Sequence, residues 1–460
     1  MNGEKNLMEF KNKNALVIGA GISGFAAAKV AKKFGANVIL SDAKTEDKIE
    51  GDLNSLRDMG IKLIFDEQKE ELLNDIDIVI LSPAVPVKIP LVQAAYKKNI
   101  PVTTEIELAY NFAKSPISAV TGTNGKTTAT TLLGELLKAH YEKVGVGGNI
   151  GTPLVDEALR IGENGAIAAE ISSYQMEATN HFHPKVTAVL NVTPDHLKRH
   201  GDMETYQKMK EKLFKEETDE DFVVLNYDDE RTRSMATRTK AKVYYFSRKE
   251  KFNNGAFLAG DILTISDNGS LHPLLTTGEL GIKGGHNVEN ALAAAMSAYL
   301  MGTGANEMIP VLKKFKGVEH RIEFVREYNG IAYYNDSKAT NTDSAIKALE
   351  TFDNHIILIA GGDDKGTDLT EFMKLVKERC DALILVGDAA KRFEKAAVDV
   401  GFDRNCIYKA DYDMQKALNI AKDIAKEPQI VLLSPACASF DMYKNFEERG
   451  KDFKRIVKGF

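Results

Sequence analysis

The stretch ALVIGAGISGFAAAKVAKKFGANVILSD, residues 15–42, decides how the first part of the chain folds. It reads as an apolar strand, a Gly-x-Gly-x-x-Gly turn at Gly19, Gly21 and Gly24, a helix, a second strand and a closing acid, Asp42. This order is typical of a Rossmann turn, whose backbone N–H groups bind the pyrophosphate of a dinucleotide. On this stretch alone, a nicotinamide or flavin oxidoreductase and a protein that binds another nucleotide are both open interpretations.

Apolar runs that end in Gly, Ser, Asp or Thr recur along the whole chain. IDIVILSP, ISAVTG, VTAVLNVT, HIILIAGG and QIVLLSP are examples, and helical stretches separate them. Continuous Val, Ile and Leu runs are typical of parallel strands buried on both faces, so we predict an α/β protein with several sheets. The dipeptide Asn268-Gly269, between two alternating runs, adds a predicted β-hairpin.

The breaks between these runs divide the chain into three predicted domains. Residues 1–112 form a Rossmann-like N-terminal domain, and residues 113–314 form a central P-loop ATPase domain that has a parallel sheet and a small antiparallel sheet. Residues 315–460 form a Rossmann-like C-terminal domain. A chain of 460 residues is long enough for this number of hydrophobic cores.

The composition excludes several classes of protein. With 43% hydrophobic and 27% charged residues, a formal net charge of −6 and no basic cluster, the chain is not expected to bind nucleic acid. No apolar run approaches the ~20 residues that span a bilayer, and the N-terminus lacks the apolar core of a signal peptide. The three cysteines form no CxxC pair, which favours a reducing compartment. We therefore expect a cytoplasmic protein without a membrane partner. We also expect a monomer, a state that the composition does not decide.

A second glycine-rich turn points away from redox chemistry. The residues GTNGKT, 122–127, follow the strand ISAV and open the helix TTATTLLGELLKAH, which gives the pattern GxxGK[ST]. This pattern is two residues shorter than the usual phosphate loop, but its backbone N–H groups and the helix N-terminus can still bind phosphate oxygens. Lys126 would neutralise the β- and γ-phosphates of ATP, and the Thr127 hydroxyl would bind Mg²⁺. The predicted ATP-binding residues of this turn are Gly122, Thr123, Asn124, Gly125, Lys126, Thr127 and Thr128.

The next two predicted strands end in groups that suit a phosphate–Mg²⁺ site. The strand AIAAE ends in Glu170, and VTAVLNVTPDH ends just before His196. Ligands of an open parallel sheet lie at the carboxyl ends of the strands, so the phosphate loop, Glu170 and His196 should converge. Glu170 is the expected Mg²⁺ ligand, with a salt bridge at the sheet edge as the alternative. His196 and His200 lie four apart, but the residues between them lack the Glu of HExxH, so zinc is not expected.

Taken together, these motifs resemble the Mur ligases, the ATP-dependent amide-bond ligases of peptidoglycan synthesis. TGTNGKTT, GGNIGTPL, EISSYQME, LNVTPDHLKRHG, GGHNVENALAAA, HRIE and GGDDKG occur in the order of that family. NDSKATN and SPACASFDMYKNFEERG resemble the members that add D-glutamate to UDP-N-acetylmuramoyl-L-alanine. The resemblance implies that the first domain holds the uridine nucleotide of the substrate, and that the reaction uses ATP, two Mg²⁺ ions and an acyl-phosphate intermediate. Other ligases of the superfamily, such as folylpolyglutamate synthase-like enzymes, and a dinucleotide oxidoreductase remain as alternatives.

The resemblance also implies roles for individual residues. His196 and Lys210 would hold the second Mg²⁺, with Lys210 carbamylated because CO₂ addition turns its ammonium group into an anionic oxygen ligand. Lys338 would contact the transferring phosphoryl group. The nucleotide sugar would bind at Gly21, Ile22, Ser23, Asp42 and Asn149. Further ATP contacts would be Asn287, Asn290, Arg321 and Asp336, and the D-glutamate pocket would consist of Lys365, Thr340, Ser439, Phe440 and Phe446. In the turn Ser82-Pro83-Ala84, Ala84 stands where relatives often have glycine.

Overall fold

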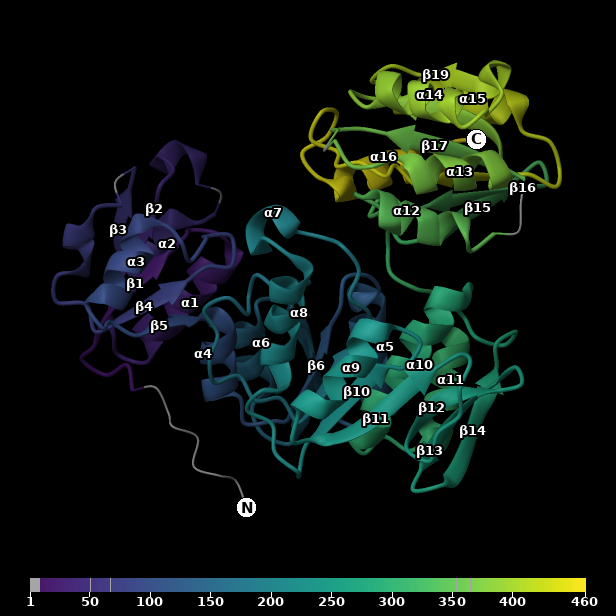
Figure 1. The fold of residues 1–460 in the computed structure, drawn as a ribbon. Helices are drawn as coiled ribbons and strands as arrows, with labels where there is room; N and C mark the ends of the chain where they lie inside the picture. Colours follow the sequence, from purple (N-terminus) through teal and green to yellow (C-terminus); the bar gives the residue numbers. More distant parts are fainter. Residues whose placement is uncertain (1–8, 50, 67, 353–354, 365) are drawn as a thin grey trace. The chain divides into compact units, whose positions relative to one another are not determined.

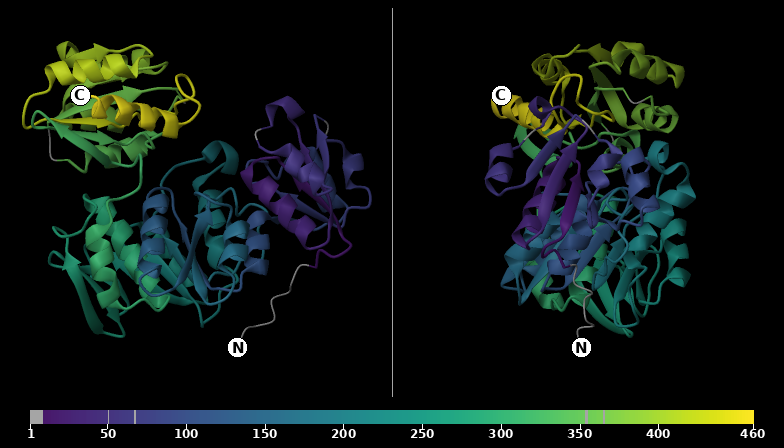
Figure 2. Two further views of the ribbon diagram at one scale, coloured as in Figure 1. Left: turned by 180° about the vertical axis from the view of Figure 1, so that it is seen from behind. Right: turned by 90° about the vertical axis from the view of Figure 1, so that its left-hand side faces the viewer.

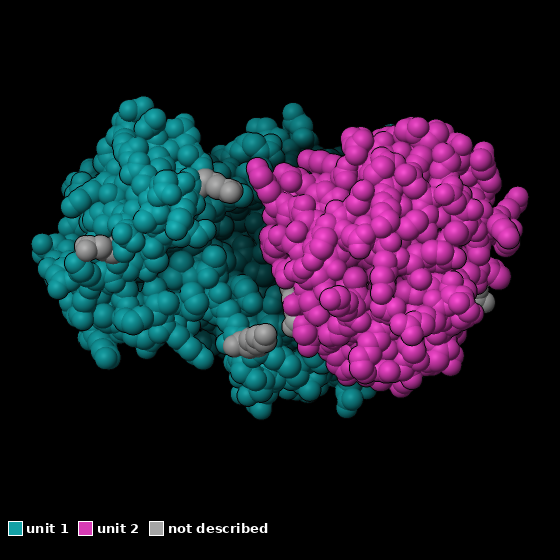
Figure 3. All heavy atoms as spheres, turned by 90° about the horizontal axis from the view of Figure 1, so that it is seen from above, with its two compact units in different colours: residues 1–280, 289–314 teal, residues 281–288, 315–460 magenta. Residues whose placement is uncertain are grey.

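The computed structural model describes residues 9–49, 51–66, 68–352, 355–364 and 366–460. These residues divide into two compact units, which Figure 3 colours separately. The first unit comprises residues 1–280 and 289–314, and the second comprises residues 281–288 and 315–460. The first unit contains two sheets and the second contains one.

The first sheet has five parallel strands in the order β3-β2-β1-β4-β5. The strands are β1 Asn14–Ile18, β2 Asn37–Asp42, β3 Lys62–Phe65, β4 Ile78–Leu81 and β5 Val102–Thr104, and the helices are α1 Ile22–Lys33, α2 Leu53–Asp58, α3 Pro90–Lys97 and α4 Glu105–Phe112. Alternate residues of β1 face opposite cores: Ala15 and Val17 pack with α1, and Leu16 and Ile18 pack with α3. The strand order reverses between β1 and β4, which is where Rossmann-type sheets bind their ligands.

The second sheet has nine strands in the order β14-β13-β12-β11-β10-β9-β6-β8-β7 (Figure 1). The strands are β6 Ile117–Thr121, β7 Lys143–Gly148, β8 Gly165–Glu170, β9 Val186–Val189, β10 Phe222–Asn226, β11 Lys242–Ser247, β12 Gly255–Ala259, β13 Ile262–Asp267 and β14 Ser270–Thr276. The helices of this part of the chain are α5 Lys126–Leu137, α6 Leu154–Ile161, α7 Leu197–His200, α8 Met203–Glu211, α9 Glu230–Ser234, α10 Gly285–Leu300 and α11 Ala305–Lys314. Strands β6 to β12 pair in parallel, and β12, β13 and β14 pair antiparallel.

The third sheet has six strands in the order β15-β16-β20-β17-β18-β19, and of these described strands β15 alone is antiparallel to its neighbour. The strands are β15 Glu323–Tyr328, β16 Ile331–Asn335, β17 Ile356–Gly361, β18 Cys380–Val386, β19 Ile407–Lys409 and β20 Ile430–Leu433, and the helices are α12 Thr342–Leu349, α13 Thr370–Arg379, α14 Ala390–Asp399, α15 Met414–Ile424 and α16 Phe446–Lys458. Helices α12, α13 and α14 pack against one face, and α15 and α16 pack against the other (Figure 2). Helices thus cover both faces of β17, and this is why its residues form an uninterrupted apolar run in the sequence.

The predicted fold class is confirmed. The apolar runs expected to be strands form β1, β2, β4, β6, β8, β9, β10, β17, β18 and β20. The hairpin at Asn268-Gly269 joins β13 to β14, and both turn residues have positive φ, of 50° and 83°. The antiparallel strands continue the edge of the central sheet instead of forming a separate layer. The boundaries at residues 112 and 314 stay a prediction. No helix among the described residues is both long and apolar enough to cross a bilayer.

Candidate active site

The predicted phosphate loop connects β6 to α5 at the carboxyl edge of the second sheet. Gly122 and Gly125 have φ of 152° and 83°, a region that side chains strongly disfavour. A Cβ at Gly125 would lie 2.2 Å from Asn290 Oδ1, so the loop passes directly against α10. Asn191, which follows β9, accepts hydrogen bonds at its Oδ1 from the backbone N–H groups of Thr123 and Asn124. The loop is thus held from both sides with its helix N-terminus at the sheet edge.

The two lysines assigned to phosphate chemistry lie at this loop. Lys126 Nζ donates to the carbonyl oxygens of Gly122 and Thr123, at 2.9 and 2.8 Å. Lys210 Nζ donates to the same Gly122 oxygen at 2.8 Å and lies 4.3 Å from the centre of the Tyr206 ring. Lys210 is only 1% exposed although α8 reads as a solvated helix. Its burial, together with the nearby charge of Lys126, holds the pKa of its amine well below the usual value of a lysine.

Glu170 ends β8, which lies next to β6, and it is almost fully buried. Its Oε1 accepts a hydrogen bond of 2.8 Å from Asn149 Nδ2, so the structure brings together two residues that the sequence assigned to different ligands. The other carboxylate oxygen, Oε2, is buried and has no hydrogen-bond partner in the described structure. Since an unpartnered buried carboxylate oxygen is costly, this atom fits a hard cation such as Mg²⁺.

His196 stands at the N-cap of the one-turn helix α7, with a positive φ of 55°. Its Nδ1 lies 3.0 Å from the hydroxyl oxygen of Tyr174, and its Nε2 lies 3.4 Å from Asp195 Oδ2. The Tyr206 hydroxyl, 3.2 Å from Thr123 Oγ1, connects the phosphate loop to the same cluster of rings. The Tyr174 hydroxyl thus fixes the orientation of the imidazole at Nδ1, and the other ring nitrogen, Nε2, lies beside the Asp195 carboxylate.

The glycine turn after β1 has the tight packing that its pattern requires. A Cβ at Gly24 would lie 1.8 Å from the Gly19 carbonyl oxygen, whereas a Cβ at Gly21 would meet only Ser82 Oγ, at 3.9 Å. Asp42 accepts a hydrogen bond of 2.7 Å from the Ala20 N–H. Its carboxylate therefore stabilises the conformation of the glycine turn. Ile22 is 76% exposed at the start of α1.

In the second unit, the predicted residues Asp336 and Lys338 follow β16, whereas Arg321 precedes β15. Asp336 is buried, accepts hydrogen bonds from the Ile322 N–H and the Ser434 hydroxyl, and has its pKa raised by burial to about 7. Arg321 Nε is buried without a hydrogen-bond partner among the described residues.

Lys338 Nζ lies 5.5 Å from the centre of the Phe446 ring, so these two predicted residues are neighbours. Thr340 follows in the same turn, where its N–H donates to the Lys338 carbonyl. Asn287 lies in the first turn of α10 and donates to the Lys283 carbonyl.

A buried arginine organises the predicted amino-acid pocket. Arg449, 1% exposed on α16, donates to the Ser337 hydroxyl and carbonyl and to the carbonyls of Cys437 and Ala438. Arg449 thereby joins the segment before Lys338 to the segment before Ser439. The Ser439 side chain is buried, whereas Phe440, the next residue, is 70% exposed. Lys365, also predicted for this pocket, lies outside the described residues.

Several residues of these sites were not found from the sequence. Tyr174, Arg199, Tyr206 and Arg449 lie within the motifs EISSYQME, LNVTPDHLKRHG, YQKMKEK and NFEERG, but nothing in their spacing predicts their partners. Arg449 lies 112 positions from Ser337, for example, so only the folded chain brings the two together.

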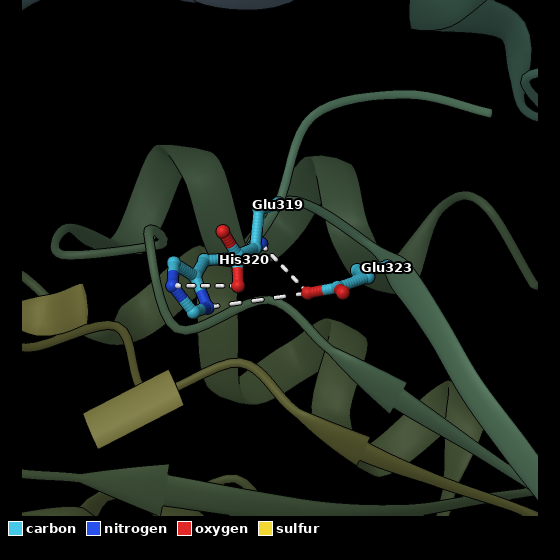
Figure 4. Close-up of side chains that lie close together, drawn as sticks. All are labelled: Glu319, His320 and Glu323. Atoms are coloured by element: carbon cyan, nitrogen blue, oxygen red, sulfur yellow. Dashed lines mark hydrogen bonds and ion pairs between the residues drawn. The ribbon is translucent and has the colours of Figure 1, made fainter. Parts of the chain in front are cut away.

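A group of potential metal ligands lies at the start of the third sheet. Figure 4 shows Glu319, His320 and Glu323, whose ligand atoms all lie within 4.8 Å of one another. The ammonium group of Lys454 contacts both carboxylates, and Asn335 Nδ2 lies 2.9 Å from His320 Nδ1. Because Lys454 already supplies the positive charge, we assign no metal to this group.

Three family descriptions match successive parts of the chain. The N-terminal domain of MurD-like Mur ligases matches residues 13–104, the Mur ligase middle domain matches residues 120–298, and the glutamate ligase domain of Mur ligases matches residues 320–437. Together these matches cover most of the chain and fall on the first, second and third sheets.

Curated relatives are similar over nearly the full length. The UDP-N-acetylmuramoylalanine--D-glutamate ligase of Pelotomaculum thermopropionicum is 46% identical over 451 residues, which are 98% of each chain. The ligase of the same name from Clostridioides difficile is 42% identical over 452 residues, 98% of this chain and 99% of the relative.

Solved structures share the fold at low identity. MurF ligase of Thermotoga maritima in complex with ADP has a TM-score of 0.60 at 16% identity and covers 100% of this chain and 97% of its own. UDP-N-acetylmuramate-alanine ligase MurC of the same organism has a TM-score of 0.58 at 21% identity, with 97% and 99% covered.

Proposed function

The chain belongs to the Mur ligase family, and we propose that it is the ATP-dependent ligase that adds D-glutamate to UDP-N-acetylmuramoyl-L-alanine. The observation that carries this proposal is the similarity, at 40–46% identity over 98% of the chain, to ligases that bear this name. The glycine turn after β1 would then bind the pyrophosphate of a UDP-sugar. This pyrophosphate can accept hydrogen bonds from the same N–H groups that bind the pyrophosphate of a redox coenzyme in other proteins.

The proposed reaction has two steps. The carboxylate of the L-alanine residue is a poor acyl donor because oxide would have to leave. Transfer of the γ-phosphoryl group of ATP to a carboxylate oxygen gives an acyl phosphate and ADP. The amine of D-glutamate then attacks the acyl carbon, loses a proton and displaces phosphate, which leaves the new amide. Lys126 and the N–H groups of residues 122–127 would offset charge on the transferring phosphoryl oxygens, and Lys338 would do so from the third domain.

Two Mg²⁺ sites are part of the proposal. Thr127 and Glu170 would hold the first ion, and His196 and a carbamylated Lys210 would hold the second. The unpartnered Glu170 Oε2 supports the first site. The lowered pKa of Lys210 supports the modification, because only a neutral amine adds CO₂. When bound, the ions would offset phosphoryl charge and orient the acceptor carboxylate.

The remaining residues are proposed to bind the two substrates to be joined. Gly21, Ile22, Ser23, Asp42 and Asn149 would hold the nucleotide sugar; Asn287, Asn290, Arg321 and Asp336 would contact ATP; and Thr340, Lys365, Ser439, Phe440 and Phe446 would hold D-glutamate. The working unit is proposed to be a monomer. The use of ATP and the three free cysteines support a cytoplasmic location.

A phosphate-release assay tests the function. The purified chain is given ATP, Mg²⁺ and UDP-N-acetylmuramoyl-L-alanine, with D-glutamate, L-glutamate, L-lysine or no amino acid. We expect sustained release only with D-glutamate, and a product heavier by one glutamate residue in the mass spectrum. Equal release with every amino acid, or none with D-glutamate, contradicts the proposal. Release that persists when a folate replaces the nucleotide sugar would favour a folylpolyglutamate synthase-like ligase.

A further inference from the structure

The helix that begins after His196 is too short to hold its own position. Helix α7 comprises only Leu197–His200, and isolated helices of one turn are unstable. Its last two residues fasten it instead: His200 Nε2 lies 3.0 Å from the Ser173 hydroxyl, and Arg199 makes a larger set of contacts. The placement of His196, at the other end of α7, therefore depends on these side chains.

Arg199 ties α7 to the turn that borders the nucleotide-sugar site. Its guanidinium forms two hydrogen bonds with the Glu177 carboxylate, at 2.7 and 2.8 Å. It also donates to the carbonyl oxygens of Pro83, Ala84 and Val85, at 3.1, 3.3 and 3.2 Å. The Arg199 and Glu177 side chains are only 17% and 10% exposed, so solvent competes little for these bonds.

The turn at residues 82–85 lies beside the glycine turn after β1. The Ser82 N–H donates to the Ile18 carbonyl, and a Cβ at Gly19 would lie 2.7 Å from Ser82 Cβ. Both turns lie at the carboxyl ends of the neighbouring strands β1 and β4, where the strand order reverses. A ligand in the glycine turn therefore adjoins the turn that Arg199 holds.

The other side of Arg199 faces the ring that orients His196. The guanidinium carbon lies 4.2 Å from the centre of the Tyr174 ring, and the Tyr174 hydroxyl lies 3.0 Å from His196 Nδ1. A second connection runs along the backbone, since the Arg199 N–H donates to the His196 carbonyl at 3.0 Å. Both connections end at His196.

We propose that Arg199 is a positioning residue that couples the nucleotide-sugar site at residues 82–85 to the orientation of the His196 imidazole. Binding of the sugar nucleotide and binding of a divalent cation by His196 then strengthen one another. The inference rests on the proposed function for the identity of the two ligands. A lysine would keep the charge of Arg199 but lose the planar fork that contacts a carboxylate, three carbonyls and a ring at once.

Calorimetry of the full chain tests this coupling without turnover. The dissociation constant of UDP-N-acetylmuramoyl-L-alanine is measured with no metal and with saturating Mn²⁺, in the absence of ATP. Since coupling between two ligands is reciprocal, the ratio of the two constants reports it, and we expect a ratio of about 5 or more in the unmodified chain. Arg199→Lys should bring the ratio close to one, and Tyr174→Phe should lower it while keeping the ring beneath the guanidinium.

Arg160→Lys is the matched control. Arg160 likewise forms two hydrogen bonds with a glutamate, Glu157, and one with a carbonyl, that of Val144. It should leave the ratio unchanged, and the melting temperature of each variant checks its folding. A ratio near one in the unmodified chain, or one that survives in both Arg199→Lys and Tyr174→Phe, overturns the inference. Coupling without any amide product would contradict the proposed function and leave this inference standing.

Discussion

Lys126 and Lys210 donate hydrogen bonds to the same atom, the carbonyl oxygen of Gly122, at 2.9 and 2.8 Å. A carbonyl oxygen can accept two such bonds, but two ammonium groups at that spacing repel each other. Lys126 starts α5 and is partly accessible, whereas Lys210 is buried, so Lys210 is the group that loses its proton more readily. Of the two lysines, Lys210 is therefore the one suited to react with CO₂, since only a neutral amine adds CO₂.

We expect the change Lys210→Met to stabilise the protein while abolishing ligation. The folded chain binds the Lys210 proton less tightly than the unfolded chain does, so this residue lowers stability at neutral pH and less so as the pH rises toward the ordinary lysine pKa. The free energy of unfolding at pH 7, in CO₂-depleted buffer, should rise by about 1–3 kcal/mol. Urea unfolding at pH 7 and pH 9 measures this, and a gain that is larger at pH 9 would contradict the prediction.

A carboxylate supplied from solution should replace the proposed carbamate. Lys210→Ala removes the amine and leaves a buried space beside Gly122, so turnover should fall and be partly restored by formate, acetate or propionate. Lys212→Ala is the control, because Lys212 also donates to a backbone carbonyl, that of Met176, but is not proposed as a ligand. Phosphate release at increasing concentrations of each acid measures the rescue. Equal rescue of both variants, or none of Lys210→Ala, would argue against a carbamate.

Two glycines of the first turn should respond differently to alanine. Gly24→Ala places a Cβ against the Gly19 carbonyl, so it should cost about 1–3 kcal/mol of stability through overpacking. Gly21 has an ordinary φ of −89° and open space around it, so Gly21→Ala should keep the melting temperature and weaken binding of the nucleotide sugar by blocking its pyrophosphate. Thermal unfolding and calorimetry separate the two effects. Unchanged sugar binding in Gly21→Ala would remove this turn from the substrate site.

The parts of the site that the sequence predicts are those whose chemistry lies in contiguous residues. The glycine turn at residues 19–24 and the loop at residues 122–127 need only neighbouring backbone groups, and their strands and helices follow from the apolar pattern. Contacts between distant segments follow no such pattern. Arg199 contacts residues more than 110 positions away, and the sequence gives no sign of the burial of Lys210 or of the Asn149–Glu170 hydrogen bond.

Glu105 is another residue whose burial the sequence does not predict. From this burial we expect the stability of the protein to depend on pH. Glu105 follows β5 at the start of α4, and acids in the first turn of a helix are usually exposed. It is instead 1% exposed, accepts a hydrogen bond of 2.6 Å from the Val155 N–H, and has its pKa raised by burial to about 7. Its second carboxylate oxygen is buried without a hydrogen-bond partner in the described structure.

Between pH 4.5 and 7, the folded chain keeps the Glu105 proton while the unfolded chain has lost it, so this residue makes stability fall as the pH rises. Glu105→Gln removes that dependence and can still accept from the Val155 N–H. The variant should therefore gain on the order of 3 kcal/mol relative to the unmodified chain between pH 4.5 and pH 8. Glu163→Gln is the control: pairing with Lys114 lowers the pKa of Glu163, so its effect should lie below pH 4.5. Urea unfolding across this range measures the difference in the free energy of unfolding between each variant and the unmodified chain. If this difference did not change with pH for Glu105→Gln, the Glu105 carboxylate would already be ionised in the folded chain.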